Sequence, residues 1–346
     1  MSTRTERRDK IQSVRGLIDA DRLGPTLMHE HLLCDITPPE LAAQGLPDIE
    51  ITLENCWEVR HHWCRHMGNN RLDDKSVAVA ELRRLREAGG RSVVDLTCAG
   101  IKPDPLGLRE ISELAEVTII AGCGYYVEAH LDPSLNDRNV DDLAAGMIDD
   151  VERGIGGTDV KAGIIGEIGA SEPWTALERK TLQAAAIAQR ETGASLSIHP
   201  GRRPESPAEI VDLVATAGGD PARCIISHVD RTIFDRDTLF HLADTGCVIE
   251  YDFFGIESSY YPFQDIDLPN DATRLAAIRA LIDRGHLAQV LISQDICTKT
   301  RLTRYGGHGY GHVFDNVVPM MRRKGFEPAE ITTILEGTPR RLLTFQ

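Results

Sequence analysis

Eight short apolar runs, separated by longer amphipathic stretches, constrain the fold of this 346-residue chain more than any other feature. Their hydrophobicity is continuous rather than alternating, which is typical of strands buried on both faces, as in a parallel sheet. Each run ends in polar or glycine-containing sequence. The runs lie at residues 26–28, 92–97, 117–121, 162–166, 195–198, 223–226, 247–251 and 289–293.

The stretches between most of these runs are long enough to form the crossover helices that parallel strands require. Examples lie at residues 75–88, 177–191 and 272–284, where apolar residues recur at helical spacing. Eight such alternations predict an α/β chain folded as a single (β/α)₈ TIM barrel. A six-stranded doubly wound sheet is the alternative, but no G-x-G-x-x-G follows the first run.

The chain shows no internal repeat, low-complexity tract or linker, so we expect one domain over residues 1–346. The segment between the first and second runs, at about 36–90, is too long for a simple crossover. We expect it to carry extra helical structure over one end of the barrel.

The charge balance limits the classes of partner. Lys and Arg number 38 against 53 Asp and Glu, which gives a net charge of −15 with neutral histidines. So acidic a surface repels phosphate backbones and anionic lipids, which argues against nucleic-acid and membrane partners and favours a small-molecule substrate.

Three features predict a cytoplasmic protein. No apolar run approaches the roughly 18 residues that a membrane helix needs. The basic first ten residues are followed by polar sequence rather than by the apolar stretch of a signal peptide. The eight cysteines are scattered singly and several lie in apolar runs, which favours buried, reduced thiols.

In a barrel of this kind, residues at the carboxyl ends of the strands line the active site. His29, Glu30 and His31 follow the first run. Because side chains alternate along a strand, His29 and His31 share a face while Glu30 points away. Four further metal-competent residues end the fourth, fifth, sixth and eighth runs: Glu167, His199, His228 and Asp295.

Those residues, without Glu30, supply six nitrogen and oxygen ligands from five strand ends. A single histidine or aspartate at a strand end more often hydrogen-bonds to the backbone than binds metal. Six at the same relative position predict a centre with two divalent cations such as Zn²⁺, bridged by a carboxylate and a water.

Several residues beyond the strand ends are candidates for substrate contact. Arg202 and Arg231 follow ligand-bearing strands, and a guanidinium binds a sulfonate or carboxylate bidentately. Lys299 and Arg301 follow Asp295. The alternative for each cation is a pair with one of the abundant acidic residues.

Two further features lie near the predicted site. Tyr126, beyond the third run, could donate to a substrate carbonyl or to the oxygen between the metals; packing at the mouth is its alternative. The glycine-rich segment 305–312 permits close backbone approach to a ligand, and we expect it to shape the substrate site.

The segment Gly24-Pro-Thr-Leu-Met-His-Glu-His31 resembles the opening strand of the phosphotriesterase family, within the amidohydrolase superfamily. The resemblance runs from about Val14 to Phe345 and is densest after residue 160. Further matching stretches are Gly163-Ile-Ile-Gly-Glu-Ile-Gly169, Ile198-His-Pro-Gly-Arg202, Ser227-His-Val-Asp-Arg-Thr-Ile233, Glu250-Tyr-Asp-Phe-Phe-Gly255, Asp295-Ile-Cys-Thr-Lys-Thr-Arg-Leu302 and Tyr305-Gly-Gly-His-Gly-Tyr310.

The resemblance implies a binuclear metal-dependent hydrolase. His29, His31 and Asp295 would hold the buried metal, His199 and His228 the more exposed one, and Glu167 would bridge them. Many phosphotriesterases use a carboxylated lysine as the bridge, so Glu167 is a departure that argues against efficient phosphotriester turnover. The metals are expected to be zinc, with manganese, cobalt or nickel as alternatives.

The predicted reaction is attack on an amide carbonyl by hydroxide held between the metals, with Asp295 passing the proton to the leaving nitrogen. The expected substrate is a small N-acylated anion such as N-acetyltaurine or an N-acyl amino acid. The alternatives are a lactonase, carboxylesterase or phosphotriesterase using the same site, and a non-catalytic small-molecule-binding barrel. By analogy with relatives we expect a homo-oligomer, specifically a dimer.

Overall fold

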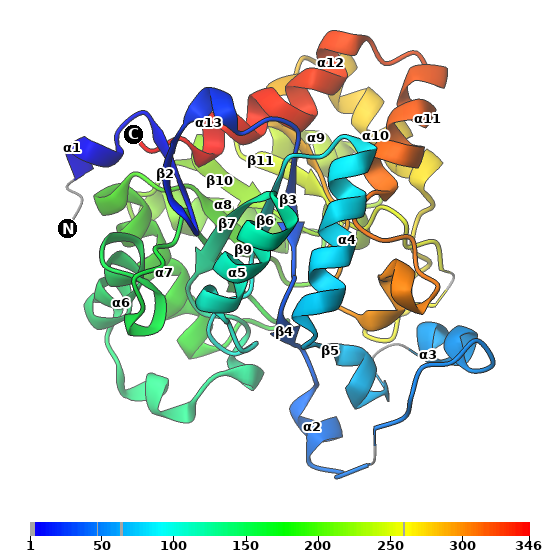
Figure 1. Cartoon of the computed structure of the whole chain (residues 1–346). Coiled ribbons are helices and arrows are strands. Elements are labelled where there is room, and N and C mark those ends of the chain that lie inside the picture. Colours follow the sequence, from blue (N-terminus) through cyan, green and yellow to red (C-terminus); the bar gives the residue numbers. More distant parts are fainter. Residues whose placement is uncertain (1–3, 47, 63–64, 259) are drawn as a thin grey trace.

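Eight parallel strands form a nearly closed barrel, as the sequence predicts, in a computed structural model that describes residues 4–46, 48–62, 65–258 and 260–346 (Figure 1). In chain order they are β3 (Thr26–Glu30), β6 (Ser92–Asp95), β7 (Thr118–Cys123), β8 (Ile164–Gly169), β9 (Leu196–His199), β10 (Cys224–Ile226), β11 (Val248–Tyr251) and β12 (Val290–Ile292). Each pairs with the next in sequence. The Ser293 hydroxyl, which donates to the carbonyl of His29 at 2.9 Å, joins the end of β12 to β3.

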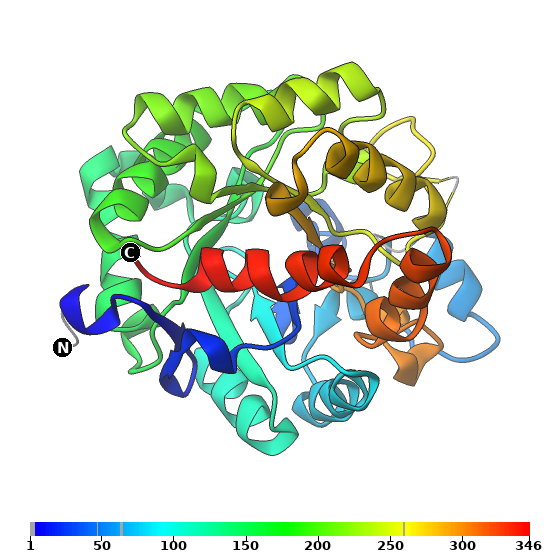
Figure 2. The same ribbon diagram turned by 90° about the horizontal axis from the view of Figure 1, so that it is seen from above.

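Helices between the strands surround the barrel (Figure 2). The principal ones are α4 (Lys75–Ala88), α5 (Pro105–Ala115), α6 (Val140–Glu152), α7 (Ala176–Thr192), α8 (Ser206–Thr216), α9 (Arg236–Asp244) and α10 (Asp271–Asp283). Their starts follow from local sequence: the Asp74 carboxylate accepts from the first turn of α4, and Thr175 and Glu178 form a capping box on α7.

The core has two main parts, besides a small cluster of Phe253, Tyr261 and Leu268. The barrel interior is filled by apolar side chains from the strands, including Met28, Ile120 and Leu291. At the amino-terminal end of the strands it is closed by Leu342 and Leu343 of α13 (Thr338–Leu343), which crosses this end of the barrel in Figure 2. The larger part lies between the outer faces of the strands and the helices.

The amino-terminal segment and the end of the chain lie on that same side of the molecule (Figure 1). The amino-terminal segment contains the short helix α1 (Arg4–Arg7) and an antiparallel hairpin of β1 (Lys10–Ser13) and β2 (Gly16–Asp19). Two short helices, α11 (Val318–Arg323) and α12 (Pro328–Thr332), precede α13.

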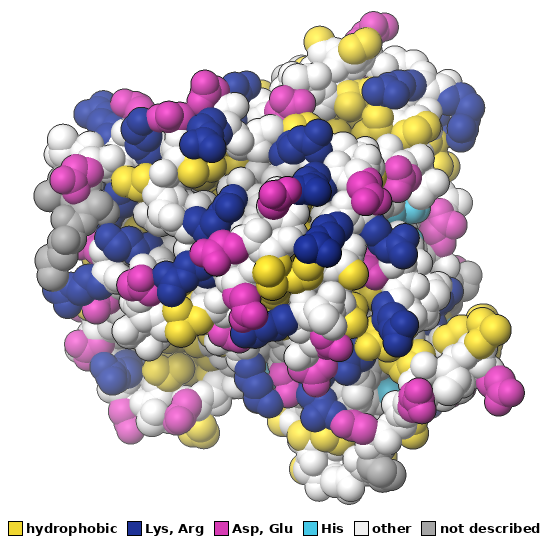
Figure 3. Space-filling view, in the orientation of Figure 1, with side chains coloured by type: hydrophobic (Ala, Val, Ile, Leu, Met, Phe, Trp, Pro, Cys, Tyr) yellow, Lys and Arg dark blue, Asp and Glu magenta, His cyan; other side chains and the backbone are white. Residues whose placement is uncertain are grey.

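The long connection between β3 and β6 carries its own elements at the opposite, carboxyl-terminal end of the strands (Figure 1). It contains β4 (Cys34–Asp35), α2 (Pro39–Ala42), α3 (Cys56–His61), β5 (Arg71–Leu72) and then α4. Four large apolar side chains in the described part of this connection are exposed, and Figure 3 shows apolar atoms over α3. These four, which we call the apolar ridge, are Leu46, Ile49, Leu53 and Trp57.

Elsewhere on the face drawn in Figure 3, cationic and anionic side chains are intermixed. Seven cysteines carry free thiols, and Cys64 lies outside the described residues. Within the described part of the chain, no helix has both the length and the apolar character needed to cross a membrane.

Candidate metal centre

The six predicted ligands meet at the carboxyl-terminal end of the barrel. His29 lies within β3, His199 ends β9, and Glu167 lies within β8, two residues before its end. His31, His228 and Asp295 follow β3, β10 and β12. Because the strands are parallel, their carboxyl ends lie at one edge of the sheet, and all six side chains except the partly exposed His199 are buried there.

Two of these residues have an unusual backbone. His228 and Asp295 have φ angles of 54° and 46°, in the left-handed region that non-glycine residues rarely adopt. Both are held by hydrogen bonds: the His228 amide donates to Asp252, and the Asp295 amide donates to the His29 carbonyl. Such conformations cost roughly 1–3 kcal/mol and are concentrated at functional sites.

One group of donors is formed by His29, His31, Glu167 and Asp295. Nε2 of His31 lies 3.5 Å from Oε1 of Glu167 and 3.3 Å from Oδ1 of Asp295. Nε2 of His29 lies 3.7 Å from Oε2 of Glu167 and 3.8 Å from Oδ1 of Asp295. Two imidazole nitrogens and two carboxylates therefore surround one point in the barrel.

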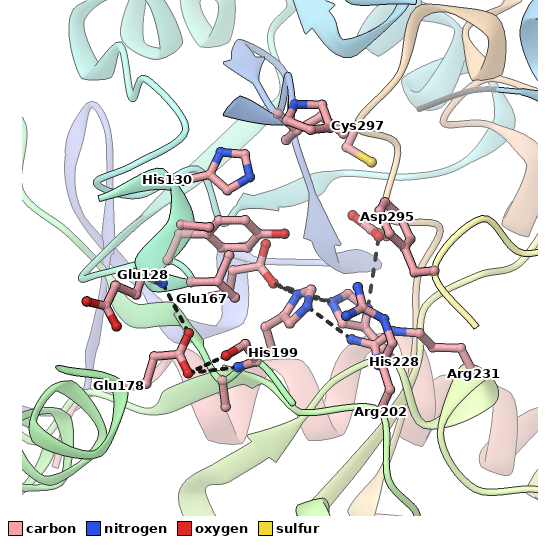
Figure 4. Close-up of a pocket in the computed structure, with 18 of the residues that line it drawn as sticks. Glu128, His130, Glu167, Glu178, His199, Arg202, His228, Arg231, Asp295 and Cys297 are labelled. Carbon is pink, nitrogen blue, oxygen red and sulfur yellow. Dashed lines mark hydrogen bonds and ion pairs between the residues drawn. The ribbon is translucent and has the colours of Figure 1, made fainter. Parts of the chain in front are cut away.

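A second group shares Glu167 with the first (Figure 4). Nδ1 of His199 lies 3.0 Å from Oε2 of Glu167 and 2.9 Å from Nε2 of His228. Nε2 of His228 lies 3.4 Å from the same carboxylate oxygen. Glu167 therefore belongs to both groups, with Oε1 near His31 and Oε2 near His29, His199 and His228.

The residues present fit divalent cations. In each group, donor atoms of three residues lie within 4.8 Å of one another. Nε2 of His29 is buried and has no hydrogen-bond partner among the described residues. A buried unsatisfied nitrogen is costly, and a zinc ion, which binds imidazole nitrogen at about 2.0–2.1 Å, would satisfy it.

The electrostatics of the groups agree with this. Burial lowers the pKa of His31, but Asp295 and Glu167 outweigh it and raise that pKa to about 9. Burial raises the pKa of Glu167, but the surrounding histidines hold that pKa well below its usual value. The Glu167 carboxylate is thus anionic at neutral pH, as a metal ligand must be, and a cation bound at His31 would displace the proton that the neighbouring acids hold on that ring.

Contacts to Nδ1, on the side of each ring away from the donor groups, fix the orientation of three imidazoles. Nδ1 of His228 lies 2.9 Å from Oδ1 of Asp252, and Nδ1 of His31 lies 2.9 Å from the Thr97 hydroxyl. Nδ1 of His29 lies 3.3 Å from Asp252 and 3.4 Å from Glu250. In each ring Nδ1 is engaged, which leaves Nε2 for a metal.

Sequence reasoning missed Asp252 and Glu250. A signal was available, because Glu250 lies in the seventh run and Asp252 follows it at the alternate position. Residues two apart on a strand share a face, which is the same spacing that groups His29 with His31.

Glu30 points away from the donors, as the alternation predicts, and holds the segment that carries Asp295. Its carboxylate accepts from the Ser293 hydroxyl at 2.8 Å and from the amides of Gln294 and Ile296 at 2.9 Å. Glu30, which lies between the two histidines, thus anchors the loop after β12 to β3, at the place where the barrel closes.

A cavity of about 660 Å³ opens above the donors, and the three predicted substrate residues line it. The Arg202 guanidinium lies 4.8 Å from the Phe263 ring centre, and no acidic side chain of the described residues is within ion-pair distance of it. Arg231 is buried and donates to Nε2 of His199 at 3.1 Å and to the Pro200 carbonyl at 3.0 Å. Tyr126 lies beside His199, and burial raises the pKa of its hydroxyl well above the usual value.

The other two cations do not line the cavity. Nζ of Lys299 lies 2.9 Å from Asp73. Arg301 donates to the carbonyls of Gln294 and Asp295. Lys299 thus makes the acidic pair that was the alternative for these cations, whereas Arg301 holds the backbone that carries Asp295.

The expectation for segment 305–312 was wrong, because none of its residues, all of them described, lines the cavity. Instead the Tyr310 hydroxyl donates to the His31 carbonyl at 2.5 Å. The side-chain amide of Gln294 donates to the Gly309 carbonyl at 2.7 Å. The glycines let this segment pack behind β3 and Asp295 rather than against a substrate.

Comparisons with known proteins agree with this geometry. The protein-family model described as "Phosphotriesterase family" matches residues 9–343 of this chain. The chain is 39% identical to a phosphotriesterase-related protein of Nematostella vectensis, over 97% of this chain and 98% of the relative. It is also 39% identical to an N-acetyltaurine hydrolase of Bos taurus, with the same coverage.

Among solved structures, it resembles a resiniferatoxin-binding protein from Rhodobacter sphaeroides. The TM-score is 0.91 and the identity 36%, over 97% of this chain and 95% of the other.

Proposed function

The chain belongs to the phosphotriesterase family and is a metal-dependent hydrolase, and from this premise we propose that it cleaves the amide bond of a small N-acylated anion. N-acetyltaurine and N-acyl amino acids are the substrates that we favour. The observation that carries the proposal is Arg202, a cation without an acidic partner among the described residues, in the cavity directly above the donor groups. The relative from Bos taurus is named for N-acetyltaurine hydrolysis, which supports the same substrate class.

We propose that the centre holds two divalent cations, zinc first, with manganese, cobalt or nickel as alternatives. His29, His31, Glu167 and Asp295 would hold one, and His199 and His228 would hold the other with Glu167 between them. Two of the three overlapping donor groups share Glu167, and this shared carboxylate supports two ions. When bound, such ions supply a water that is acidic near neutral pH and a Lewis acid for the substrate carbonyl.

Asp295 is the residue that we propose to move the proton. It lies on the cavity wall, and the neighbouring histidines lower its pKa, so it is ionised and ready to accept. It would take the proton of the attacking water and deliver it to the amide nitrogen. An amine leaves a tetrahedral carbon poorly unless it is protonated, so the second transfer matters more for amides than for activated esters.

The remaining cavity residues would bind and orient the substrate. Arg202 offers a planar set of donors for a sulfonate or carboxylate. Tyr126 lies beside His199, and its hydroxyl would donate a hydrogen bond to the substrate carbonyl oxygen. Arg231 would fix His199 through its bond to Nε2 while presenting positive charge to the same anionic group.

A second candidate is hydrolysis of a lactone or carboxyl ester by the same donors, or, less readily, of a phosphotriester. The apolar part of the cavity lining, which includes Ile36, Pro38 and Val127, favours a neutral substrate of this kind. A third is binding without turnover, because the Rhodobacter sphaeroides relative is described only as binding a ligand. Both differ from the first proposal in giving Arg202 no role in recognition.

The test is an incubation of zinc- or manganese-loaded protein with N-acetyltaurine, followed by measurement of acetate and taurine. An N-acyl amino acid and a γ-lactone are run in parallel, with Asp295→Asn as the inactive control. Release of taurine by the wild type alone supports the proposal. Lactone opening without amide cleavage supports the second candidate, and inertness toward all substrates supports the third.

We also propose that the protein is cytoplasmic and forms a homodimer. The seven free thiols support a reducing compartment. The exposure of the four side chains of the apolar ridge, all in one connection, supports self-association, because an interface would remove them from water. Sedimentation of the wild type and of Trp57→Glu would test the dimer, which we expect the charged variant to weaken.

A further inference from the structure

The cationic and the aliphatic side chains that line the cavity come from different loops. Arg202 and Arg231 follow β9 and β10, the fifth and sixth strands. The aliphatic lining comes largely from the loops after β3 and β7, the first and third strands, whereas the aromatic residues Phe253, Tyr261 and Phe263 follow β11. In a ring of eight strands the first strand faces the fifth across the axis, and Figure 4 shows His130, after β7, on the other side of His199 from Arg202.

The side after β9 and β10 is suited to an anion. Arg202 stacks on Phe263 and its Nε lies 3.4 Å from the Tyr261 hydroxyl, an uncharged partner. The rings hold the guanidinium in place without neutralising it, which leaves its charge for a ligand.

The side after β3 and β7 is suited to a hydrocarbon chain. It is formed by Ile36, Pro38, Pro39, Val127 and Ala129. His130 adds an uncharged ring, because burial lowers its pKa. The acids near this side disfavour a negative group: Glu40 and Glu128 both line it, and the hydrogen-bond partners of the Glu128 carboxylate, such as the Asn136 amide, are uncharged.

A third acid in the lining, Glu178, is engaged by backbone. Its carboxylate accepts from the amides of Glu128, Ser171 and Thr175 and from the Ser171 hydroxyl. It therefore holds the loops after β7 and β8 together, and it fixes the position of the apolar wall.

The cavity is larger than an acetyl group requires. A volume of about 660 Å³ is in the range that encloses a drug-sized ligand, roughly 300–1,000 Å³. With the anionic group at Arg202 and the scissile carbonyl above the donors, the space after β3 and β7 lies on the acyl side of the amide. An acetyl group would leave that apolar wall uncovered.

We propose that this wall, formed by Ile36, Pro38, Pro39, Val127 and Ala129, is a binding site for an unbranched acyl chain longer than acetyl. The preferred substrates are then medium-chain N-acyl derivatives of a small amino sulfonate or amino carboxylate. This inference rests on the proposed amide hydrolysis and adds the acyl specificity to it.

The experiment measures kcat/KM of the zinc-loaded enzyme for the acetyl, butanoyl, hexanoyl and octanoyl amides of taurine. Each methylene buried against the wall is expected to raise kcat/KM about fourfold until the chain outgrows the site. A value that is constant or falls from acetyl onward overturns the inference.

Ala129→Phe places a bulky ring in the acyl site at an exposed position of η4 (Glu128–His130). We expect it to reduce the advantage of the hexanoyl over the acetyl amide by about tenfold or more. Ala80→Phe, at an exposed position of α4 outside the cavity, is the matched control and should keep the dependence on chain length. Arg202→Gln should slow all four amides alike and leave that dependence unchanged.

Binding measurements separate the failure of this inference from failure of the proposed function. If no taurine amide is cleaved, calorimetric titration of the zinc-loaded protein with N-octanoyltaurine and N-acetyltaurine still tests the site. Tighter binding of the octanoyl compound, lost in Ala129→Phe, supports the acyl site even though the proposed reaction is wrong. Equal binding of the two compounds overturns it.

Discussion

At the scale of single residues, the centre depends on the side chains behind the ligands as much as on the ligands. Asp252 illustrates this, because one carboxylate accepts from the His228 amide, lies 2.9 Å from Nδ1 of the same residue and approaches His29. Its charge favours imidazoles that direct Nε2 toward the cavity. Removing it would release two rings at once.

We therefore predict that Asp252→Asn lowers metal affinity by about 10–100-fold, because the carboxylate that orients His228 is lost. Competition with a fluorescent zinc chelator measures the effect. Asp283→Asn, on the exposed end of α10, is the matched control and should bind metal like the wild type. An unchanged affinity in Asp252→Asn would show that Asp252 does not orient the ligands.

Asp295→Asn should lower kcat by about 10²–10⁴-fold while much of the metal is retained, because the amide side chain keeps an oxygen but cannot carry the proton. Steady-state kinetics and metal analysis of the same sample separate the two effects. Near-full activity with full metal content would remove Asp295 from the proton transfer.

Arg202→Gln should raise KM for an N-acylated anion by about 10–100-fold, since a charge-assisted hydrogen bond contributes about 1.5–3 kcal/mol. A neutral amide or a γ-lactone should show little change. The ratio of the two effects is the readout, and equal losses for both substrates would contradict recognition of the anion by Arg202.

At the scale of elements, the seam between β3 and β12 is held by side chain–backbone bonds rather than by a continuous ladder. The Glu30 carboxylate accepts two amides and a hydroxyl from residues 293–296, and the Asp295 amide donates to the His29 carbonyl. Glu30 is fully buried. The position of Asp295 is thus determined by the strand that carries the first two histidines.

Glu30→Gln should destabilise the protein by about 1–3 kcal/mol, because the amide can accept through one oxygen only and leaves a buried N–H without a partner. Thermal unfolding of the metal-free protein measures this apart from metal binding. Glu87→Gln, at an exposed position of α4, is the control and should change stability little. Equal unfolding temperatures of Glu30→Gln and the wild type would contradict the role of Glu30 at the seam.

At the scale of the whole molecule, the donors come from five strands, so metal binding and folding are linked. An unfolded chain cannot bring these residues together, and a ligand that binds only the folded state stabilises it. Removal of the metals should also leave buried polar atoms such as Nε2 of His29 unsatisfied.

Chelation should therefore lower the unfolding temperature, by an amount that corresponds to about 4 kcal/mol for each ion held at 1,000 times its Kd. Since Glu167 needs no carboxylation, reloading with zinc should restore the transition equally well in bicarbonate-free and bicarbonate-containing buffer. Calorimetry of the apo and reloaded protein is the measurement. A requirement for bicarbonate would show that Glu167 is not the group shared by the metals.

The sequence by itself determined the barrel and which residues meet at its end. Continuous apolar runs identify strands buried on both faces, and parallel strands bring their carboxyl ends together whatever the loops do. His29 and His31 share a face because side chains alternate along β3, which is a local property of the chain. Residues that end different strands, such as His199 and His228, could be grouped on the same grounds.

Only the tertiary structure decided what the residues beyond the strand ends touch. Lys299, Arg301 and Arg202 look alike as cations after strands, yet the first two bind loop partners and the third faces the cavity. Segment 305–312 lies behind β3 and not over the cavity. These contacts join loops that are far apart in sequence, and their conformations depend on packing between the loops rather than on any periodic pattern within them.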